Sequence, residues 1–314
     1  MTAFEHWHGK RYHSLDAYIK NTYGEKMYRI SINAGMTCPN RDGLIGTGGC
    51  IFCSEGGSGD FAPAAFSSIT EQIEIGKKNL AKKVNCRHFI AYFQAFTNTY
   101  ASVAHLRKLY MEAITHPDIK ILSIATRPDC LNNEILALLK EINQIKPVWI
   151  ELGLQTIHEE THQKMNTGFK LSDYEWACNE LHKLGIPVIT HVIFSLPGEN
   201  REQMLDTIRY LADRQTDGIK LHMLFVLNHT KLGDYYREHP FYLLTREEYV
   251  DLICDALELL PKECIIHRLT GDGPKDLLLE PTWTSNKLVV FNSIQKTMKK
   301  RDSYQGIHYK GGNN

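Results

Sequence analysis

Apolar, β-branched runs alternate along the chain with segments of helical periodicity. The apolar runs predict strands at 27–34, 88–95, 119–127, 148–156, 187–197, 218–227 and 264–271. Helical patterns predict helices at about 69–84, 101–116, 131–145, 158–165, 172–184, 200–215 and 245–261. Strands that are apolar almost throughout are typical of a parallel sheet covered on both faces, and the alternating order predicts right-handed crossovers.

Six or seven strand–helix units are one or two short of a closed eight-strand barrel. The sequence therefore predicts an α/β fold, a partial (β/α)6 TIM-like barrel with two extensions. We expect an N-terminal extension at 1–26, a core barrel at 27–230 and a C-terminal extension at 231–314 that packs on the core. The polar tail after about residue 296 is expected to be loose. In such folds chemistry lies at the C-terminal ends of the strands.

The composition is that of an ordinary globular protein, with 314 residues, 43% hydrophobic and 23% charged. It excludes a disordered protein, a coiled coil and a disulfide miniprotein. The 36 Lys and Arg residues balance 36 Asp and Glu residues, which argues against a strongly basic nucleic-acid binder but permits a local basic face. Basic runs at 76–88 and 296–302 fit either solvated helix faces or phosphate contacts.

Nothing in the sequence predicts a membrane partner. No apolar stretch approaches the ~20 residues that cross a bilayer, and the N-terminus, MTAFEHWHGKRYHSLD, lacks the apolar run of a secretory signal. We therefore expect a cytoplasmic protein, in which thiols stay reduced and clustered cysteines bind metal or do chemistry more often than they pair.

Three of the eight cysteines, Cys38, Cys50 and Cys53, lie in one glycine-rich loop directly after the first predicted strand. Thiolates at this spacing, in a loop whose glycines can wrap around an inorganic core, are typical of an iron–sulfur cluster. A zinc site completed by His13 or a distant residue, or three incidental thiols, is the alternative. The other five cysteines are expected to pack mostly as small hydrophobes.

With this loop the sequence resembles the radical S-adenosylmethionine (SAM) superfamily over about residues 25–290. The usual superfamily loop is C-x3-C-x2-C; here the second gap is kept and the first is stretched to eleven residues. That variant resembles the branch of the elongator catalytic subunit and, within it, the YtqA/MnmL-like family. The resemblance implies the radical SAM type of partial barrel and a [4Fe–4S] cluster on Cys38, Cys50 and Cys53. One electron from the cluster would cleave SAM to methionine and a 5′-deoxyadenosyl radical.

The same resemblance assigns SAM contacts to residues of the cysteine loop and the strand ends, namely Phe52, Gln94, Arg127, Glu151, Gln155 and His191. Ordinary structural roles are the alternatives. Thr97 and Asn98 suit a helix N-cap, Arg127 and Asp129 suit a turn cap, Glu151 suits a buried acceptor, and His191 suits a packed strand. Related enzymes carry an arginine after the fourth strand that grips the SAM carboxylate. This chain has Thr167 there, so Lys170 or Arg127 would have to replace it.

Substrate contacts are expected at Asn98 and at the late strand end, at His267, Arg268 and Asp272, where a plain C-terminal cap is the alternative. The resemblance implies a tRNA substrate whose wobble uridine is modified on its C5 side chain. It also implies an electron donor such as flavodoxin or ferredoxin and a downstream methyltransferase. The other hypotheses are a radical SAM enzyme that acts on a small metabolite and a non-catalytic metal- or cluster-binding protein.

Overall fold

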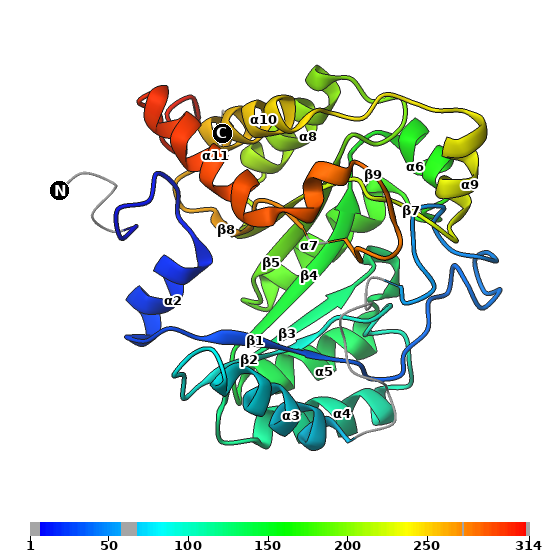
Figure 1. The fold of residues 1–314 in the computed structure, drawn as a ribbon. Coiled ribbons are helices and arrows are strands. Elements are labelled where there is room, and N and C mark those ends of the chain that lie inside the picture. The colour runs from blue at the N-terminus through cyan, green and yellow to red at the C-terminus, as the bar shows by residue number, and fades with distance from the viewer. Residues whose placement is uncertain (1–6, 58–67, 272, 312–314) are drawn as a thin grey trace. The chain divides into compact units, whose positions relative to one another are not determined.

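The computed structural model describes residues 7–57, 68–271 and 273–311. Within them, one sheet has the strand order β1-β2-β3-β4-β5-β6-β8, and the registers show parallel pairing (Figure 1). Its strands are β1 Tyr28–Ile32, β2 Phe89–Phe93, β3 Ile119–Thr126, β4 Val148–Gln155, β5 Val188–Phe194, β6 Gly218–Met223 and β8 Ile265–Arg268. The predicted α/β partial barrel is confirmed, and its seventh strand comes from the segment expected to be the C-terminal extension.

Among the described residues, seven helices follow the strands in the predicted alternation, and three further helices, at 15–23, 231–238 and 287–300, were not predicted. They are α2 Leu15–Tyr23, α3 Ile69–Ala81, α4 Val103–Thr115, α5 Asn133–Asn143, α6 Glu159–Met165, α7 Leu171–Lys183, α8 Arg201–Asp213, α9 Lys231–Glu238, α10 Arg246–Leu259 and α11 Lys287–Lys300, with short 3-10 turns η1 Pro128–Cys130 and η2 Thr282–Ser285. Capping boxes begin three of them, at Ser68, Asn200 and Thr245, because each side chain satisfies an otherwise unpaired N–H of the first turn. None of the described helices is long and apolar enough to span a membrane.

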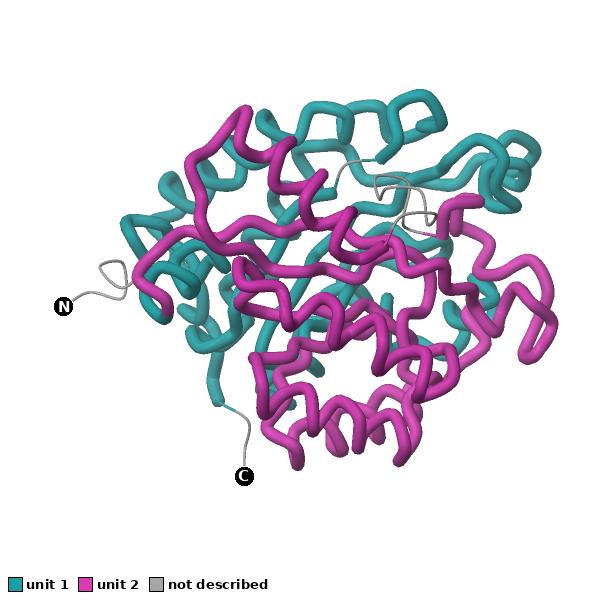
Figure 2. The backbone as a smooth tube through the Cα atoms, turned by 90° about the horizontal axis from the view of Figure 1, so that it is seen from below, with its two compact units in different colours: residues 1–22, 154–166, 189–314 teal, residues 23–153, 167–188 magenta. Residues whose placement is uncertain are grey.

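The chain divides into two compact units (Figure 2). One comprises residues 23–153 and 167–188, with β1 to β3, most of β4, and helices α3, α4, α5 and α7. In it α3 packs on β1 and α4 on β3. The ring of Phe93 lies edge-on to that of Tyr110, with centroids 5.4 Å apart, and both side chains are fully buried. The core of this unit therefore lies between its strands and its helices.

The other unit comprises residues 1–22, 154–166 and 189–314. Here α10 packs against α8 and α11. Tyr249 of α10 is fully buried, and its ring contacts Phe194 at 6.5 Å and Trp283 at 5.3 Å between centroids. The indole N–H of Trp283 donates to the carbonyl of Leu244 at 3.1 Å. This aromatic cluster joins β5 to the C-terminal segment.

The segment 218–227, predicted as one strand, contains two. β6 ends at Met223, and β7 Val226–Leu227 pairs in antiparallel fashion with β9 Leu278–Glu280 in a separate sheet. Between them the N–H of Leu224 donates to the carbonyl of Phe194 at 2.9 Å. The apolar run continues through the break because β7 is buried as well, so periodicity alone does not reveal it.

The expectation of a loose C-terminal tail was wrong. Helix α11 fills its first part, and Gln305 beyond it is fully buried. The Gln305 amide accepts from the N–H of His13 at 2.9 Å and donates to the carbonyls of Pro261 and Cys264 at 2.6 and 2.8 Å. The tail is polar because it satisfies backbone groups of other segments.

Candidate active site

The cysteine loop between β1 and α3 folds back on itself through its backbone. The N–H of Arg41 donates to the carbonyl of Cys38 at 2.8 Å, and the N–H of Gly49 donates to the carbonyl of Asn40 at 2.7 Å. Gly49 has φ +74°, and a Cβ there would lie 2.9 Å from Nε of Arg41, so glycine is needed at this turn. The second bond brings the two ends of the eleven-residue gap together and places Cys50 beside the start of the loop.

The side chains of Cys50 and Cys53 are hydrogen-bonded neighbours at the end of this loop. The bond from the Cys53 thiol lowers the pKa of Cys50 to about 7, and the charge of Arg127 and the amide of Asn40 act in the same direction. The same bond and burial raise the pKa of Cys53, on which the charge of Cys38 also acts. The three sulfur atoms therefore influence one another, and the surroundings favour the thiolate form, which binds metals, at Cys50.

Arg41 lies near the start of the cysteine loop, and its side chain binds the backbone at the end of the loop. It is not among the site residues expected from the sequence. Its guanidinium donates to the carbonyl of Ser54, to that of Glu55 at 3.2 Å and to that of Cys53 at 3.4 Å. It lies 5.4 Å from the ring centre of Phe96, a residue with φ +58° just after β2. Arg41 thus ties the end of the cysteine loop to the end of the neighbouring strand.

At the end of β3, Arg127 and Asp129 pair with each other. Nε and Nη2 of Arg127 donate to the two carboxylate oxygens of Asp129 at 2.9 and 2.8 Å, and Nη1 donates to the carbonyl of Thr167 at 2.7 Å. The guanidinium also lies 5.3 Å from the ring centre of Phe169. Burial disfavours its charge, but the bonds to Asp129 outweigh burial and raise the pKa of Arg127. Arg127 is therefore a fixed positive charge near the thiols. Lys170, the other residue expected to replace the missing arginine, is exposed at the start of α7.

Glu151 lies fully buried in β4. Its carboxylate accepts from the hydroxyl of Ser123 at 2.7 Å and forms an ion pair with Arg29 at 3.2 Å. The guanidinium of Arg29 is 5.3 Å from the ring centre of Tyr92. These four side chains come from β1, β2, β3 and β4 in turn, so they form one polar layer across the strands.

The end of β2 holds two further predicted residues. The Gln94 side chain is half-buried and accepts from the Ser31 hydroxyl at 3.1 Å. Asn98 is fully buried, and its Nδ2 donates to the carbonyls of Phe93 and Ala125 at 3.2 and 3.0 Å. Among the described residues its Oδ1 has no hydrogen-bond partner. The side-chain oxygen of Asn98 is therefore a buried acceptor that can receive a hydrogen bond from a ligand at the end of β2.

In the other unit, Gln155 is the last residue of β4 and Ser195 directly follows β5, and both have a backbone φ of +71°. Such conformations are uncommon outside glycine and cost about 1–3 kcal/mol each. The Ser195 hydroxyl accepts from the N–H of Leu244 at 3.2 Å. Burial raises the pKa of Glu199, although hydrogen bonds with Thr156 and Thr161 oppose the shift.

Basic side chains lie along β5, β6 and β8 of the same unit. His191 is opposite the buried Lys220 in the register, and its ring centre is 5.8 Å from that of His222. Lys220 is in turn opposite Arg268, while His267 lies beside Gly218, where a Cβ would be 3.0 Å from its Nε2. The structure thus places His191 on β5 and both His267 and Arg268 on β8, the strands on either side of β6. Asp272 lies outside the described residues.

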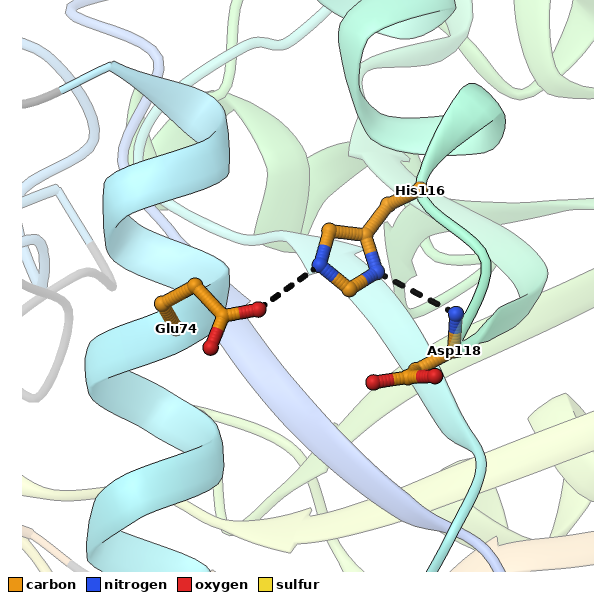
Figure 3. A group of neighbouring side chains, drawn as sticks. All are labelled: Glu74, His116 and Asp118. Carbon is orange, nitrogen blue, oxygen red and sulfur yellow. Dashed lines mark hydrogen bonds and ion pairs between the residues drawn. The ribbon is translucent and has the colours of Figure 1, made fainter.

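A second group of ligating side chains, Glu74, His116 and Asp118, lies between α3 and the start of β3 (Figure 3). His116 Nδ1 accepts from the backbone N–H of Asp118 at 3.2 Å, so Nε2 carries the proton and donates to Glu74 at 2.9 Å. Lys77 makes ion pairs with Glu74 at 2.7 Å and Asp118 at 2.5 Å. Since both imidazole nitrogens are engaged and a cation is already present, this group is an ion-pair network and not a metal site.

The chain belongs to the radical SAM superfamily. The family model of the Radical SAM superfamily matches residues 37–211, and that of the Radical_SAM C-terminal domain matches residues 216–300. Members of this superfamily use a [4Fe–4S] cluster and SAM, and these are the cofactors of the protein.

Its relatives place it in the elongator-like part of the superfamily. It is 41% identical to the protein YtqA of Bacillus subtilis over 297 residues, which cover 95% of this chain and 92% of YtqA. It is 28% identical over 169 residues to the tRNA uridine(34) acetyltransferase of Methanocaldococcus jannaschii, covering 52% of this chain and 30% of that one. The structure of Elp3 from Methanocaldococcus infernus has the same fold, with a TM-score of 0.67 at 17% identity, over 89% of this chain and 64% of that chain.

The sequence did not predict roles for Asn40 and Arg41, two residues of the cysteine loop whose side chains bind other parts of the same loop. The only local signal is the CPN sequence that opens the loop at Cys38. The bonds of both side chains reach residues that lie further along the sequence, so no spacing rule could have found them.

Proposed function

We propose that this protein is a cytoplasmic radical SAM enzyme that modifies the C5 side chain of a tRNA wobble uridine. The cysteine loop supports the radical chemistry, and the similarity to the tRNA uridine(34) acetyltransferase supports the substrate. That relative is more than three times as long as the matched part, which covers 30% of it. The wobble-uridine substrate is therefore proposed from the portion that the two proteins share.

Cys38, Cys50 and Cys53 are the proposed cluster ligands. The donor set fits, because three thiols lie in one loop, hydrogen bonds favour a thiolate at Cys50, and Arg127 supplies compensating positive charge. When bound, the cluster supplies the electron that cleaves SAM. The chain positions both cofactors and keeps water away.

SAM contacts are proposed for Phe52 and Gln94, and further along the chain for Gln155 and His191. The unpartnered Oδ1 of Asn98 suits an ammonium donor such as the SAM amino group. Related enzymes bind the SAM carboxylate with an arginine where this chain has Thr167. Arg127 is proposed to supply that positive charge instead.

One of the predicted SAM contacts is already bound by other side chains of the protein. Glu151, held by Ser123 and Arg29, is proposed to position β4 and not to touch SAM. His267 and Arg268 remain the proposed substrate contacts. A flavodoxin or ferredoxin would deliver the electron, and a methyltransferase would act on the product.

The first experiment tests the cofactor chemistry. Protein reconstituted anaerobically with iron and sulfide is mixed with SAM and dithionite, and 5′-deoxyadenosine is measured. We expect product from the parent and from Cys86→Ala, a thiol elsewhere in the same unit, and none from Cys50→Ala. A Cys50→Ala protein with a full cluster and SAM cleavage would contradict the ligand assignment, and a parent that binds only zinc would identify a non-catalytic metal protein.

The second experiment tests the substrate. Nucleosides are digested from the tRNA of a deletion strain, of its parent and of the strain complemented with Cys50→Ala. We expect one modified wobble uridine to disappear in the deletion strain and to stay absent with Cys50→Ala. An unchanged wobble-uridine profile, with SAM cleavage intact in vitro, would point to a small metabolite instead.

A further inference from the structure

Asn40 is a buried polar residue that touches a proposed cluster ligand. It is 1% exposed, and its Nδ2 lies 3.8 Å from Sγ of Cys50 and 3.4 Å from the carbonyl oxygen of Thr167. A sulfur acceptor takes hydrogen bonds at longer distances than oxygen does. One amide group therefore connects the cysteine loop to the segment that follows α6.

The orientation of this amide is set by its neighbours. If oxygen and nitrogen were exchanged, an acceptor would face both the Thr167 carbonyl and the Cys50 sulfur, and neither a carbonyl nor a thiolate sulfur can donate to it. On the other side, Oδ1 leaves no room for a side chain, since a Cβ on Gly46 would lie 2.6 Å from it and a Cβ on Gly168 3.3 Å. The N–H groups of Asn40 therefore point toward Cys50.

The second acceptor of the amide, the Thr167 carbonyl, is itself held in place. Arg127 donates to it at 2.7 Å and is fixed by its two bonds to Asp129. The carbonyl of Asn40 is likewise held by the N–H of Gly49. Asn40 thus has little freedom to turn away from the sulfur.

We propose that Asn40 is a positioning residue that donates an N–H···S hydrogen bond to the cluster ligand Cys50 and thereby raises the reduction potential of the cluster. The proposal rests on the proposed function, in which Cys50 binds the cluster. Hydrogen bonds to the sulfur atoms of a cluster are among the factors that set its potential. A donor stabilises the reduced cluster more than the oxidised one, because the reduced cluster carries one more negative charge.

The test compares Asn40→Ala and Asn40→Leu with Asn132→Ala. Asn132 caps α5 in the same unit, where its Oδ1 accepts from the N–H of Ile135 at 2.9 Å, so its variant loses a hydrogen bond without touching a thiol. Reconstituted proteins are titrated with reductant and followed by electron paramagnetic resonance, with iron content and circular dichroism measured in parallel. We expect the equilibrium constant for reducing the cluster to fall about tenfold in both Asn40 variants, which is about 59 mV for one electron, and to stay unchanged in Asn132→Ala.

Each outcome decides one of the two proposals. Loss of iron from a folded Asn40 variant, with iron retained in Asn132→Ala, would also support a positioning role. Parent-like potentials and iron contents in both Asn40 variants would overturn the inference while leaving the cluster assignment intact. A cluster that persists in Cys50→Ala would instead overturn the proposed ligand set, and the inference with it.

Discussion

The carboxylate of Glu151 on β4 lies 3.2 Å from the guanidinium of Arg29 on β1, although two strands separate them in the sheet. Neighbouring strands are about 4.8 Å apart, so three steps across a flat sheet would separate the two backbones by roughly 14 Å. The pair can meet because long side chains on the same face reach inward and these four strands curl. The buried ion pair therefore reports the curvature that makes the sheet a partial barrel.

Removing this pair should cost stability. In Glu151→Ala the carboxylate that accepts from Ser123 and pairs with Arg29 is lost, and we expect the free energy of unfolding to fall by about 3 kcal/mol. Urea denaturation measures it. The double variant Arg29→Met/Glu151→Met should lose less, because no charge is left behind in the sheet. Equal losses in the two proteins would contradict the ion-pair explanation.

Glycine at position 168 should be required for a steric reason. Gly168 has φ +77°, and a Cβ there would lie 3.1 Å from Cγ2 of Ile45 and 3.3 Å from Oδ1 of Asn40. Gly185 has φ +65° but nothing within 4 Å of the same position. Gly185→Ala should therefore lose about 1 kcal/mol from backbone strain, and Gly168→Ala should lose more and also retain less iron. If the two variants unfold at the same denaturant concentration, the contact is unimportant.

The stability of the protein should depend on the protonation of Glu199. Burial raises its pKa, so the folded protein binds this proton more tightly than the unfolded chain does. The protonated Glu199 side chain therefore adds to the free energy of unfolding at acid pH, and this stabilisation is lost as the pH rises through the raised pKa. We expect Glu199→Gln to match the parent at about pH 4 and to melt at a higher temperature than the parent at about pH 7.

The control for this prediction is Glu160→Gln. A hydrogen bond from Lys164 lowers the pKa of the exposed Glu160, so its contribution has the opposite sign and is lost on acidification. Glu160→Gln should therefore melt slightly below the parent at neutral pH. A Glu199→Gln protein that also melts below the parent there would show that the ionised form is the stable one.

The C-terminal tail should stabilise the protein through one side chain. Gln305→Ala leaves the N–H of His13 and the carbonyls of Pro261 and Cys264 without this partner. Each buried group that loses its hydrogen bond costs about 1–3 kcal/mol, so we expect a total loss of about 3 kcal/mol or more by urea denaturation. Asp302→Asn, which removes the exposed charge that pairs with Arg11 and keeps a residue type that tolerates the φ of +47° there, should change little. A similar effect of the two substitutions would mean that the tail is held by other contacts.

The sequence by itself determined the order of elements and the location of the cysteine loop. The run at 119–127 became β3 Ile119–Thr126, and that at 148–156 became β4 Val148–Gln155. Burial of whole strands requires continuous apolar runs, and a loop that gathers three thiols requires glycines. Both are local features, so the residues record them directly.

Only the tertiary structure decided what the polar residues of those elements contact. Arg127 bonds Asp129 and Thr167, Glu151 meets Arg29, and Asn40 reaches Cys50. The sequence shows such side chains as polar positions in apolar surroundings, but a buried donor or acceptor can be satisfied by any partner that the fold brings within about 3 Å. The curvature of the sheet and the path of the loops determine which partner lies within this distance. Both are properties of the folded chain and are not visible in the local sequence.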